Sequence, residues 1–323
     1  MFRTPVSPKK SARKISLNDP LFLIGSCFSE NIGLKLSENK FDNLTNPYGV
    51  IYNPLSIFKL MEDALLEKTI DDNFILKNQG IFRHYDFHSD ISALNKDDLL
   101  IQIGEANKYS KIYLLQSKWI LITLGTAIVY IHKKLNGIVS NCHKVPAKEF
   151  EKRRLHPDEI LKAFDSFYQT LKSLNKDFNV ILTVSPVRHI KDSFETNSIS
   201  KSILRYACGV LSESYENVQY FPAFEIMMDD LRDYRFYNTD MLHPNDSAIE
   251  YIWEAFQQSY FSDDTIQFLK DWAKVRNALN HKPFFPDSEE YQQFLKSTIH
   301  HLKAFQSRVD ISNELRLLKK QLK

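Results

Sequence analysis

Four apolar runs rich in β-branched residues recur at wide intervals along the chain. They read LFLIG (21–25), WILITLG (119–125), VILTVSP (180–186) and the shorter VQYFP (218–222). Runs of this length without polar alternation are typical of strands that are buried on both faces, as in a parallel sheet. The pattern therefore predicts a parallel sheet with both faces covered.

Segments with helical periodicity lie between these runs. Their apolar residues recur at i, i+3, i+4 and i+7 over residues 56–68, 97–115, 157–174 and 198–215. Strands that alternate with helices in this way predict an α/β protein with a doubly wound parallel sheet, in three layers α/β/α with right-handed crossovers. Ligands of such proteins bind beyond the carboxyl ends of the strands.

The pattern changes after residue 261. Two long helical stretches, separated by the breaker NHKPFFPDS, fill residues 263–323, and no strand signal remains there. The charged end of this region is a candidate surface for self-association into a homo-oligomer. We therefore expect three parts: a basic N-terminal segment (1–20), an α/β catalytic domain (21–261) and a helical C-terminal extension (262–323).

Composition is that of an ordinary globular protein and excludes several classes of partner. The 323 residues are 43% hydrophobic and 25% charged, and the formal net charge of +2 gives no reason to expect nucleic acid or an anionic membrane as partner. The basic stretch SPKKSARK (7–14) is short and predicts a solvated tail. No apolar run approaches the roughly 20 residues that cross a bilayer.

Cysteine usage bears on the compartment. Cys27, Cys142 and Cys208 are too sparse for a disulfide framework, and without a C-x-x-C they do not indicate a zinc knuckle. The apolar run before Cys27 is also shorter than the roughly 7–15-residue core of a secretion signal. Together these features predict a reduced, cytoplasmic protein.

The residues that carry candidate chemistry lie near strand ends. Cys27 stands where the first predicted strand turns into a helix, and NTDMLHPND (238–246) places Asp240 three residues before His243. An Asp in this position can hold the Nδ1–H of the imidazole, so the other ring nitrogen is free to take a proton from a nucleophile. A thiol at a helix N-terminus or beside an imidazolium has a depressed pKa. The alternative for Cys27 is a small buried hydrophobe, as most free cysteines are.

The order of these motifs resembles the SGNH, or GDSL-like, hydrolase superfamily. There a Gly-Asp-Ser follows the first strand, a glycine and an asparagine complete the oxyanion hole, and a late D-x-x-H supplies the base; the resemblance implies a flavodoxin-like strand order. The closer resemblance is to the GSCFA family, named for the GSCF at 25–28. Further stretches that look like this family are NPYGVIYNP (46–54), TLGTAIVY (123–130), NCHKVP (141–146), SPVRH (185–189) and LRDYRFYNTDMLHP (231–244).

The superfamily resemblance implies a covalent mechanism. Gly25-Ser26-Cys27 falls on the Gly-Asp-Ser of the superfamily, so Cys27 takes the position of the nucleophile. His243 would then be the general base and later the acid, and Asp240 would orient it. Ser26 is the alternative nucleophile, because a shift of one residue in the turn would present its hydroxyl instead.

The resemblance also implies an oxyanion hole. The backbone N–H groups of Cys27 and Gly49 are the candidates, and Gly49 has the equal alternative of serving only a turn in NPYG. The asparagine of the superfamily would fall two residues after Gly125, where this chain has alanine. Either the Thr126 hydroxyl or Asn141 then replaces the asparagine, or the hole is incomplete.

Three further residues are candidates for substrate binding. His143 follows close after the asparagine of NCHKVP and could line the site; its alternative is a structural histidine. Arg188 and His189 follow the strand VILTV and could bind a carboxylate, a phosphate or a sugar hydroxyl. For Arg188 and His189, the alternative is a salt bridge to the acidic segment 229–233.

No cofactor and no metal are indicated. The chain has neither G-x-x-x-x-G-K nor G-x-G-x-x-G, the motifs that cradle phosphates. His84 and His88 in FRHYDFHSD would share one face of a helix and mimic a metal pair. The aromatic residues of that stretch favour a strand or loop instead, and no third ligand is evident.

The sequence therefore predicts a hydrolase of ester bonds, with O-acyl groups on a carbohydrate as the candidate substrate and a Cys-His-Asp site. An O-acyltransferase would use the same residues. The rival hypothesis is a catalytically silent protein on the same scaffold that binds a carbohydrate or a protein. The missing asparagine and the Cys in place of Ser favour the rival, whereas the retained Asp240 and His243 argue against it.

Overall fold

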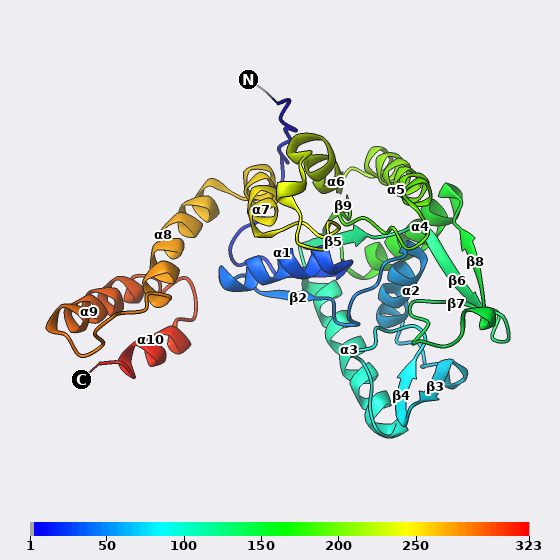
Figure 1. Cartoon of the computed structure of the whole chain (residues 1–323), viewed down its shortest axis with the longest axis horizontal. Coiled ribbons are helices and arrows are strands. Elements are labelled where there is room, and N and C mark those ends of the chain that lie inside the picture. Colours follow the sequence, from blue (N-terminus) through cyan, green and yellow to red (C-terminus); the bar gives the residue numbers. More distant parts are fainter. Residues whose placement is uncertain (1–2, 323) are drawn as a thin grey trace.

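A five-stranded parallel sheet forms the centre of the protein, as seen in the computed structural model, which describes residues 3–322 (Figure 1). The strands lie in the order β10-β9-β5-β1-β2, and every neighbouring pair is parallel. This is the flavodoxin-like order, in which the chain winds outward from β1 to both edges. The sheet comprises β1 (Leu21–Gly25), β2 (Asn43–Thr45), β5 (Trp119–Leu124), β9 (Asn179–Val184) and β10 (Val218–Tyr220).

Helices cover both faces of the sheet, so the predicted doubly wound, three-layer α/β/α fold is confirmed. Side chains alternate along each strand: Leu21 and Leu23 of β1 enter one apolar core, and Phe22 and Ile24 enter the other. The first core is shared with α1 (Cys27–Glu38) and α7 (Asp246–Tyr260). The second is shared with α2 (Pro54–Leu65), α3 (Lys96–Gln116), α4 (Pro157–Leu174) and α5 (Phe194–Ser214).

Two antiparallel insertions were not predicted, because their strands are short and only partly buried. One is the hairpin of β3 (Ile75–Asn78) and β4 (Ile81–His84). The other is a three-stranded sheet of β6 (Ile128–His132), β7 (Gly137–Val139) and β8 (Phe150–Arg154). Short helical turns complete the α/β part: η1 (Asp72–Phe74), η2 (Ala147–Glu149), α6 (Ala223–Glu225), η3 (Ile226–Leu231) and η4 (Tyr234–Phe236).

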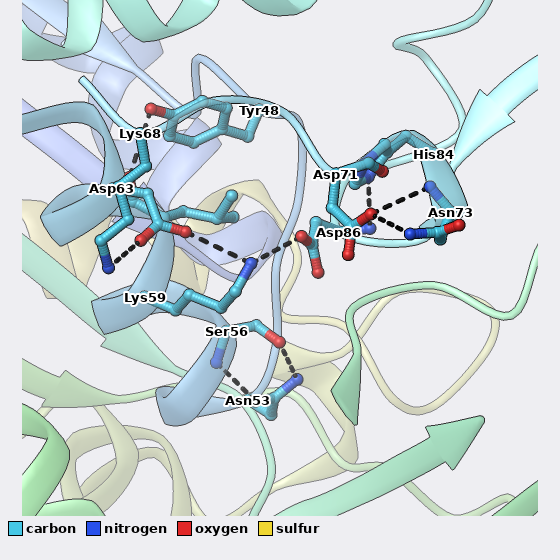
Figure 2. Close-up of polar contacts among 11 residues, drawn as sticks. Tyr48, Asn53, Ser56, Lys59, Asp63, Lys68, Asp71, Asn73, His84 and Asp86 are labelled. Atoms are coloured by element: carbon cyan, nitrogen blue, oxygen red, sulfur yellow. Dashed lines mark hydrogen bonds and ion pairs between the residues drawn. The ribbon is translucent and has the colours of Figure 1, made fainter. Parts of the chain in front are cut away.

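Figure 2 shows how the hairpin is fixed to α2. Nζ of Lys59 lies 2.6 Å from Oδ2 of Asp86, which follows β4, and 3.3 Å from Oδ2 of Asp63 on its own helix. His84 ends β4, so its stretch is strand and loop, as predicted. Its Nδ1 accepts from the backbone N–H of Asp86, and its Nε2 lies 3.1 Å from the carbonyl oxygen of Asp71. Both ring nitrogens of His84 are therefore used in holding the insertion together.

The C-terminal region is helical, as predicted, and Figure 1 shows it extending sideways from α7. It consists of α8 (Asp263–Leu279), α9 (Glu289–Lys303) and α10 (Ser312–Lys319). Its apolar side chains continue the core of α1 and α7. Trp272 Nε1 donates to the carbonyl oxygen of Glu38 over 2.9 Å, and Lys40 pairs with Glu314 over 2.6 Å, so the extension is docked against the end of α1.

The N-terminal segment is less solvated than the sequence suggests. Lys9 and Lys10 are exposed, but Ser11 and Ile15 are buried. The backbone N–H groups of Ser11 and Ile15 donate to carbonyls at the end of α7, and Ile15 forms a β-bridge with Phe261. The apolar side chain of Ile15 therefore packs into the core, and this holds the end of the basic stretch against the end of α7. Within residues 3–322, no helix combines the length and the apolar character that crossing a bilayer requires.

Gly25, at the end of β1, provides a test of the fold. Its φ is +139°, and a Cβ built on it would lie 2.1 Å from the carbonyl oxygen of Thr123 in the paired strand β5. We expect Gly25→Ala to lower the free energy of unfolding by about 2 kcal/mol or more, because both backbone strain and a clash oppose the methyl group. Denaturant unfolding followed by circular dichroism measures this.

Gly104→Ala is the matched control, because Gly104 is in α3 with no atom within 4 Å of a built Cβ. We expect it to leave stability unchanged or to raise it by about 0.5–1 kcal/mol. A Gly25→Ala variant as stable as the Gly104→Ala variant would contradict the described approach of β1 to β5.

Candidate active site

The turn from β1 into α1 separates the two candidate nucleophiles. Ser26 is the N-cap of α1; its hydroxyl accepts a hydrogen bond from the backbone N–H of Phe28 over 3.3 Å, and the residue is 0% exposed. Cys27 is the first residue of the helix and is only partly buried. The Ser26 hydroxyl therefore serves the helix start, and the thiol is the more accessible of the two groups.

Burial dominates the electrostatics of Cys27. It raises the pKa of the thiol, and the carboxylate of Glu30 raises it further. Lys201 and the backbone N–H groups of Cys27 and Phe28 lower it by less, so the pKa of Cys27 stays above its ordinary value. The expectation of a depressed pKa is wrong, because removing the sulfur from water outweighs the helix N-terminus.

Asp240 and His243 form the pair that the sequence predicts. Nδ1 of His243 lies 2.6 Å from Oδ2 of Asp240. The other carboxylate oxygen accepts from the backbone N–H groups of Leu242 and His243, over 2.9 and 3.0 Å. These hydrogen bonds hold the pKa of Asp240 down at about 2. The imidazole side chain is 45% exposed, and its Nε2 has no hydrogen bond among the described residues.

Helices α1 and α7 lie side by side and run in the same direction. Nζ of Lys35 on α1 lies 2.6 Å from Oε2 of Glu250 on α7. The ring of Phe41, which follows α1, stacks on that of Phe261, which follows α7, with centroids 5.1 Å apart. Because the contact further along α1 is also the one further along α7, the two helices run in the same direction and both begin toward the carboxyl edge of the sheet.

This packing brings Cys27 and His243 to one edge, since Cys27 opens α1 and His243 lies just before α7. No hydrogen bond joins the sulfur to the imidazole among the residues described. His189 is within electrostatic reach of His243: burial, and then the charges of Lys201 and His243, lower its pKa to about 4. Its ring meets that of Tyr52 edge-on at 5.1 Å.

Lys201 is a buried residue at this edge that the sequence analysis missed. It is on α5, is 2% exposed, and its Nζ donates to the carbonyl oxygens of Gly125 and Ser185 over 2.8 Å each. Burial lowers its pKa to about 7, and the charge of Cys27 acts to raise it. The sequence did contain a signal for this burial. Lys201 precedes Leu204 and Cys208 by three and seven residues, a spacing that places all three on the apolar side of the helix.

The oxyanion candidates other than Cys27 already have partners. The backbone N–H of Gly49 donates to the carbonyl oxygen of Asn46 over 2.8 Å, so Gly49 serves the turn in NPYG. The backbone N–H groups of Gly125 and Thr126 both donate to the carbonyl oxygen of Tyr52. The Thr126 hydroxyl accepts from the backbone N–H of Ile128 and lies 3.1 Å from the hydroxyl of Ser200. The backbone N–H groups of Gly49, Gly125 and Thr126 are therefore not free donors.

Asn141 and His143 hold a loop to the β3–β4 insertion. The side-chain oxygen of Asn141 accepts from the backbone N–H of His143 over 2.8 Å, and its amide donates to the hydroxyl of Ser89. Nε2 of His143 lies 2.9 Å from the carbonyl oxygen of His84, and Nδ1 lies 3.2 Å from the Ser89 hydroxyl. Burial lowers the pKa of His143 to about 4. The observed contacts of both residues are structural.

Arg188 packs on the loop that carries His243. Its guanidinium lies 4.3 Å from the ring centre of Tyr237 and 5.4 Å from that of Tyr234. The salt bridge to residues 229–233, the alternative that the sequence left open, is absent among the described residues. Nε of Arg188 and Nε2 of His189 are buried with no hydrogen-bond partner there. Burial therefore leaves two polar nitrogens without a partner among the described residues on this side of the sheet edge.

No metal centre is found in residues 3–322: no three His, Cys, Asp or Glu side chains gather closely enough to hold an ion. His88, the second histidine of the metal-like pair, has its Nδ1 3.0 Å from a carboxylate oxygen of Asp90.

The fold and these residues define a doubly wound α/β protein with a thiol and an Asp–His pair at the carboxyl edge of the sheet. The chain belongs to the GSCFA family, whose model matches residues 20–256. A second model, described as the C-terminal domain of GSCFA domain proteins, matches residues 272–323. A comparison with curated proteins found no match.

Solved structures with a similar outline include three carbohydrate-active enzymes. A family 3 carbohydrate esterase from Talaromyces cellulolyticus is 10% identical with a TM-score of 0.35, over 78% of this chain and 99% of that chain. A catalytic mutant of an acetylxylan esterase from Geobacillus stearothermophilus is 13% identical with a TM-score of 0.36, over 77% and 97%. A family 2 carbohydrate esterase with a carbohydrate-binding domain, from Corynascus thermopiles, is 12% identical with a TM-score of 0.38, over 83% and 69%. At these values the likeness carries no argument about chemistry.

Asp240 provides a test of the loop geometry. Its pKa is lowered to about 2, so we expect the carboxyl group to stay ionised until the pH falls to that value. Because the folded-state pKa is the lower one, the stabilisation is present above the ordinary pKa and is lost as the pH falls through about 2. Carbon NMR of the aspartate carboxyl groups, assigned with Asp240→Asn, measures the midpoint. Titration at the ordinary value would contradict the hydrogen bonds described.

Proposed function

We propose that the protein is a hydrolase of the SGNH type that cleaves an ester through an acyl group carried on Cys27. The observation that carries the proposal is the parallel packing of α1 and α7, which brings the N-terminal thiol of one helix and the Asp240–His243 loop of the other to the same edge. Catalytic hydrogen bonds of free enzymes are often longer than those of the complex. The open Cys27–His243 arrangement is compatible with that behaviour.

Each group has a defined role in the proposed reaction. His243 takes the thiol proton on Nε2 as the sulfur attacks the ester carbonyl, and it returns that proton to the departing alcohol. Water then attacks the thioester and gives its proton to His243, and the thiol is restored as the carboxylic acid leaves. Asp240 holds Nδ1–H, which leaves Nε2 as the base.

The backbone N–H of Cys27 is the proposed oxyanion donor. N–H groups in the first turn of a helix have no acceptor within the helix, and Cys27 is the first residue of α1. A donor aimed at the developing negative charge is typically worth about 10²–10³-fold in rate. With the backbone N–H groups of Gly49, Gly125 and Thr126 already bonded, this hole has fewer free backbone donors than that of the superfamily.

A carbohydrate ester is the proposed substrate. The rings of Tyr234 and Tyr237 lie beside Arg188, next to the loop of His243. Tyr234 is 61% exposed, so its face can stack on a sugar ring. Nε of Arg188 and Nε2 of His189 have no hydrogen-bond partner among the described residues, and a sugar that displaces the groups covering them would gain hydrogen bonds from these nitrogens.

The alternative is a catalytically silent binding protein on the same scaffold, and two observations favour it. The thiol has a raised pKa and no hydrogen bond to His243 among the residues described. An O-acyltransferase would use the same residues with a sugar hydroxyl in place of water.

Turnover of p-nitrophenyl acetate by variants tests the proposal. We expect Cys27→Ala to lower kcat/KM by about 10³-fold or more and His243→Ala by about 10²–10⁴-fold, because each removes a reacting group. Cys142→Ala is the matched control for loss of a partly exposed thiol and should leave kcat/KM unchanged.

The adjacent hydroxyl separates the two nucleophiles. Ser26→Ala removes a cap and should cost about 1 kcal/mol of stability while keeping turnover. Loss of turnover in a folded Ser26→Ala variant, with turnover retained in Cys27→Ala, would assign the nucleophile to Ser26. A wild-type protein that turns over no acyl substrate would favour the binding protein.

A further inference from the structure

Lys201 occupies an unusual environment for a lysine. An ammonium group has three N–H donors, and two of those of Lys201 are taken by neutral carbonyls, Gly125 O and Ser185 O. The aromatic ring of Phe224 also lies nearby, with its centre 5.9 Å from Nζ. No carboxylate forms an ion pair with Lys201 among the residues described.

The position of Lys201 is set by the sheet. Gly125 directly follows β5, the strand next to β1, and Ser185 directly follows β9, the next strand beyond β5. The Lys201 ammonium therefore lies at the carboxyl edge, beside the strand end that carries Cys27. The charge of each of these two groups acts on the other. The other titratable groups that face them are Glu30 and Tyr52 beside the thiol and His189 beside the ammonium.

We propose that Lys201 is the positioning residue whose ammonium stabilises the thiolate of Cys27, so that the buried amine and the partly buried thiol exchange one proton between a neutral pair and an ion pair. In the exchange the S–H bond breaks and an N–H bond forms through an intervening water, because no hydrogen bond joins Cys27 and Lys201 among the described residues, and the net charge of the pair does not change. This rests on the proposed function and changes the route of the proton in its first step. The proton passes from Sγ to Nζ of Lys201 before the attack and on to Nε2 of His243 during it, so His243 still protonates the departing alcohol.

The physical reason is the cost of a single buried charge. A lone thiolate or a lone ammonium in this environment is opposed by burial, as the opposite shifts of the two groups show. Forming both charges together recovers part of that cost through their attraction. The ion pair therefore supplies attacking thiolate at a site where an isolated thiol would stay protonated.

A coupled pair has a recognisable pH profile. Once the site has lost its first proton, the thiol–amine form and the thiolate–ammonium form contain the same number of protons. The population of the ion pair then stops changing with pH. An isolated thiol instead gives about tenfold more thiolate per pH unit below its pKa.

Alkylation of Cys27 by iodoacetamide, followed on the Cys27 peptide by mass spectrometry, measures this profile without any ester substrate. For the wild type we expect the rate to level off above about pH 7, where Lys201 loses its proton. In Lys201→Met we expect no plateau, and at that pH we expect the alkylation rate to be lower than that of the wild type by about tenfold or more. Lys201→Arg keeps a fixed cation and should give a rate at that pH above that of Lys201→Met, again without the plateau.

Two controls guard against indirect effects. The Cys142 peptide in the same digest should react at an unchanged rate, because Lys191 and not Lys201 acts on that thiol. Lys59→Met removes a lysine that pairs with carboxylates elsewhere and should leave the Cys27 profile unchanged. If the alkylation rate of Cys27 in Lys201→Met depended on pH as in the wild type, the proposal would be overturned. Lys201 would then have only the structural role of bonding the carbonyl groups of Gly125 and Ser185.

A second measurement covers a Lys201→Met variant that does not fold. Carbon NMR of the lysine Cε groups in Cys27→Ser should show the Lys201 titration as a single step, because the thiol that shares its proton is gone, whereas the wild type should show a second step at higher pH. Identical titrations in both proteins would overturn the proposal. Because neither readout needs turnover, a plateau in a protein that cleaves no ester would uphold the ion pair and refute only the hydrolase function.

Discussion

The close approach of β1 to β5 is the constraint on which the candidate site depends. Gly25 is opposite Thr123 in the parallel register, and no side chain fits between them. The chain can therefore turn at once, with Ser26 capping α1 and Cys27 as its first residue. A bulkier residue at Gly25 would push β1 away from β5 and move the thiol with it.

The second constraint is the water-poor environment at the carboxyl edge. Burial raises the pKa of Cys27 and lowers those of Lys201 and His189, so each of these groups is driven toward its neutral form. Asp240 differs because it is exposed and accepts hydrogen bonds from the backbone, which keep it ionised. The edge therefore combines neutral buried groups with one fixed carboxylate that holds His243.

Local patterns predicted much of this arrangement. The apolar runs predicted the buried strands. The D-x-x-H spacing predicted the contact between Asp240 and His243, because two side chains only three positions apart on one loop lie close together. The strand β2 was missed because its three residues are half-buried and form a strand only through pairing with β1. The strands of the antiparallel insertions were missed because they too are short and only partly buried.

Contacts between distant segments were beyond the sequence. The partners of Gly49 and Thr126 and the burial of Lys201 depend on how loops and α5 meet the strand ends, which no short spacing encodes. The effect of burial on Cys27 was misjudged on the same ground, because a helix N-terminus is visible in sequence and desolvation is not. The roles of the site residues stay predictions.

The most direct measurement is to trap the intermediate. The protein is mixed rapidly with p-nitrophenyl acetate, quenched in acid and digested, and the acetylated residue is located by peptide fragmentation. The account predicts an acetyl group on the sulfur of Cys27, present while product is being released and removed by neutral hydroxylamine, as a thioester is. Acetyl on Ser26, or steady product release with Cys27 never acetylated, would contradict it.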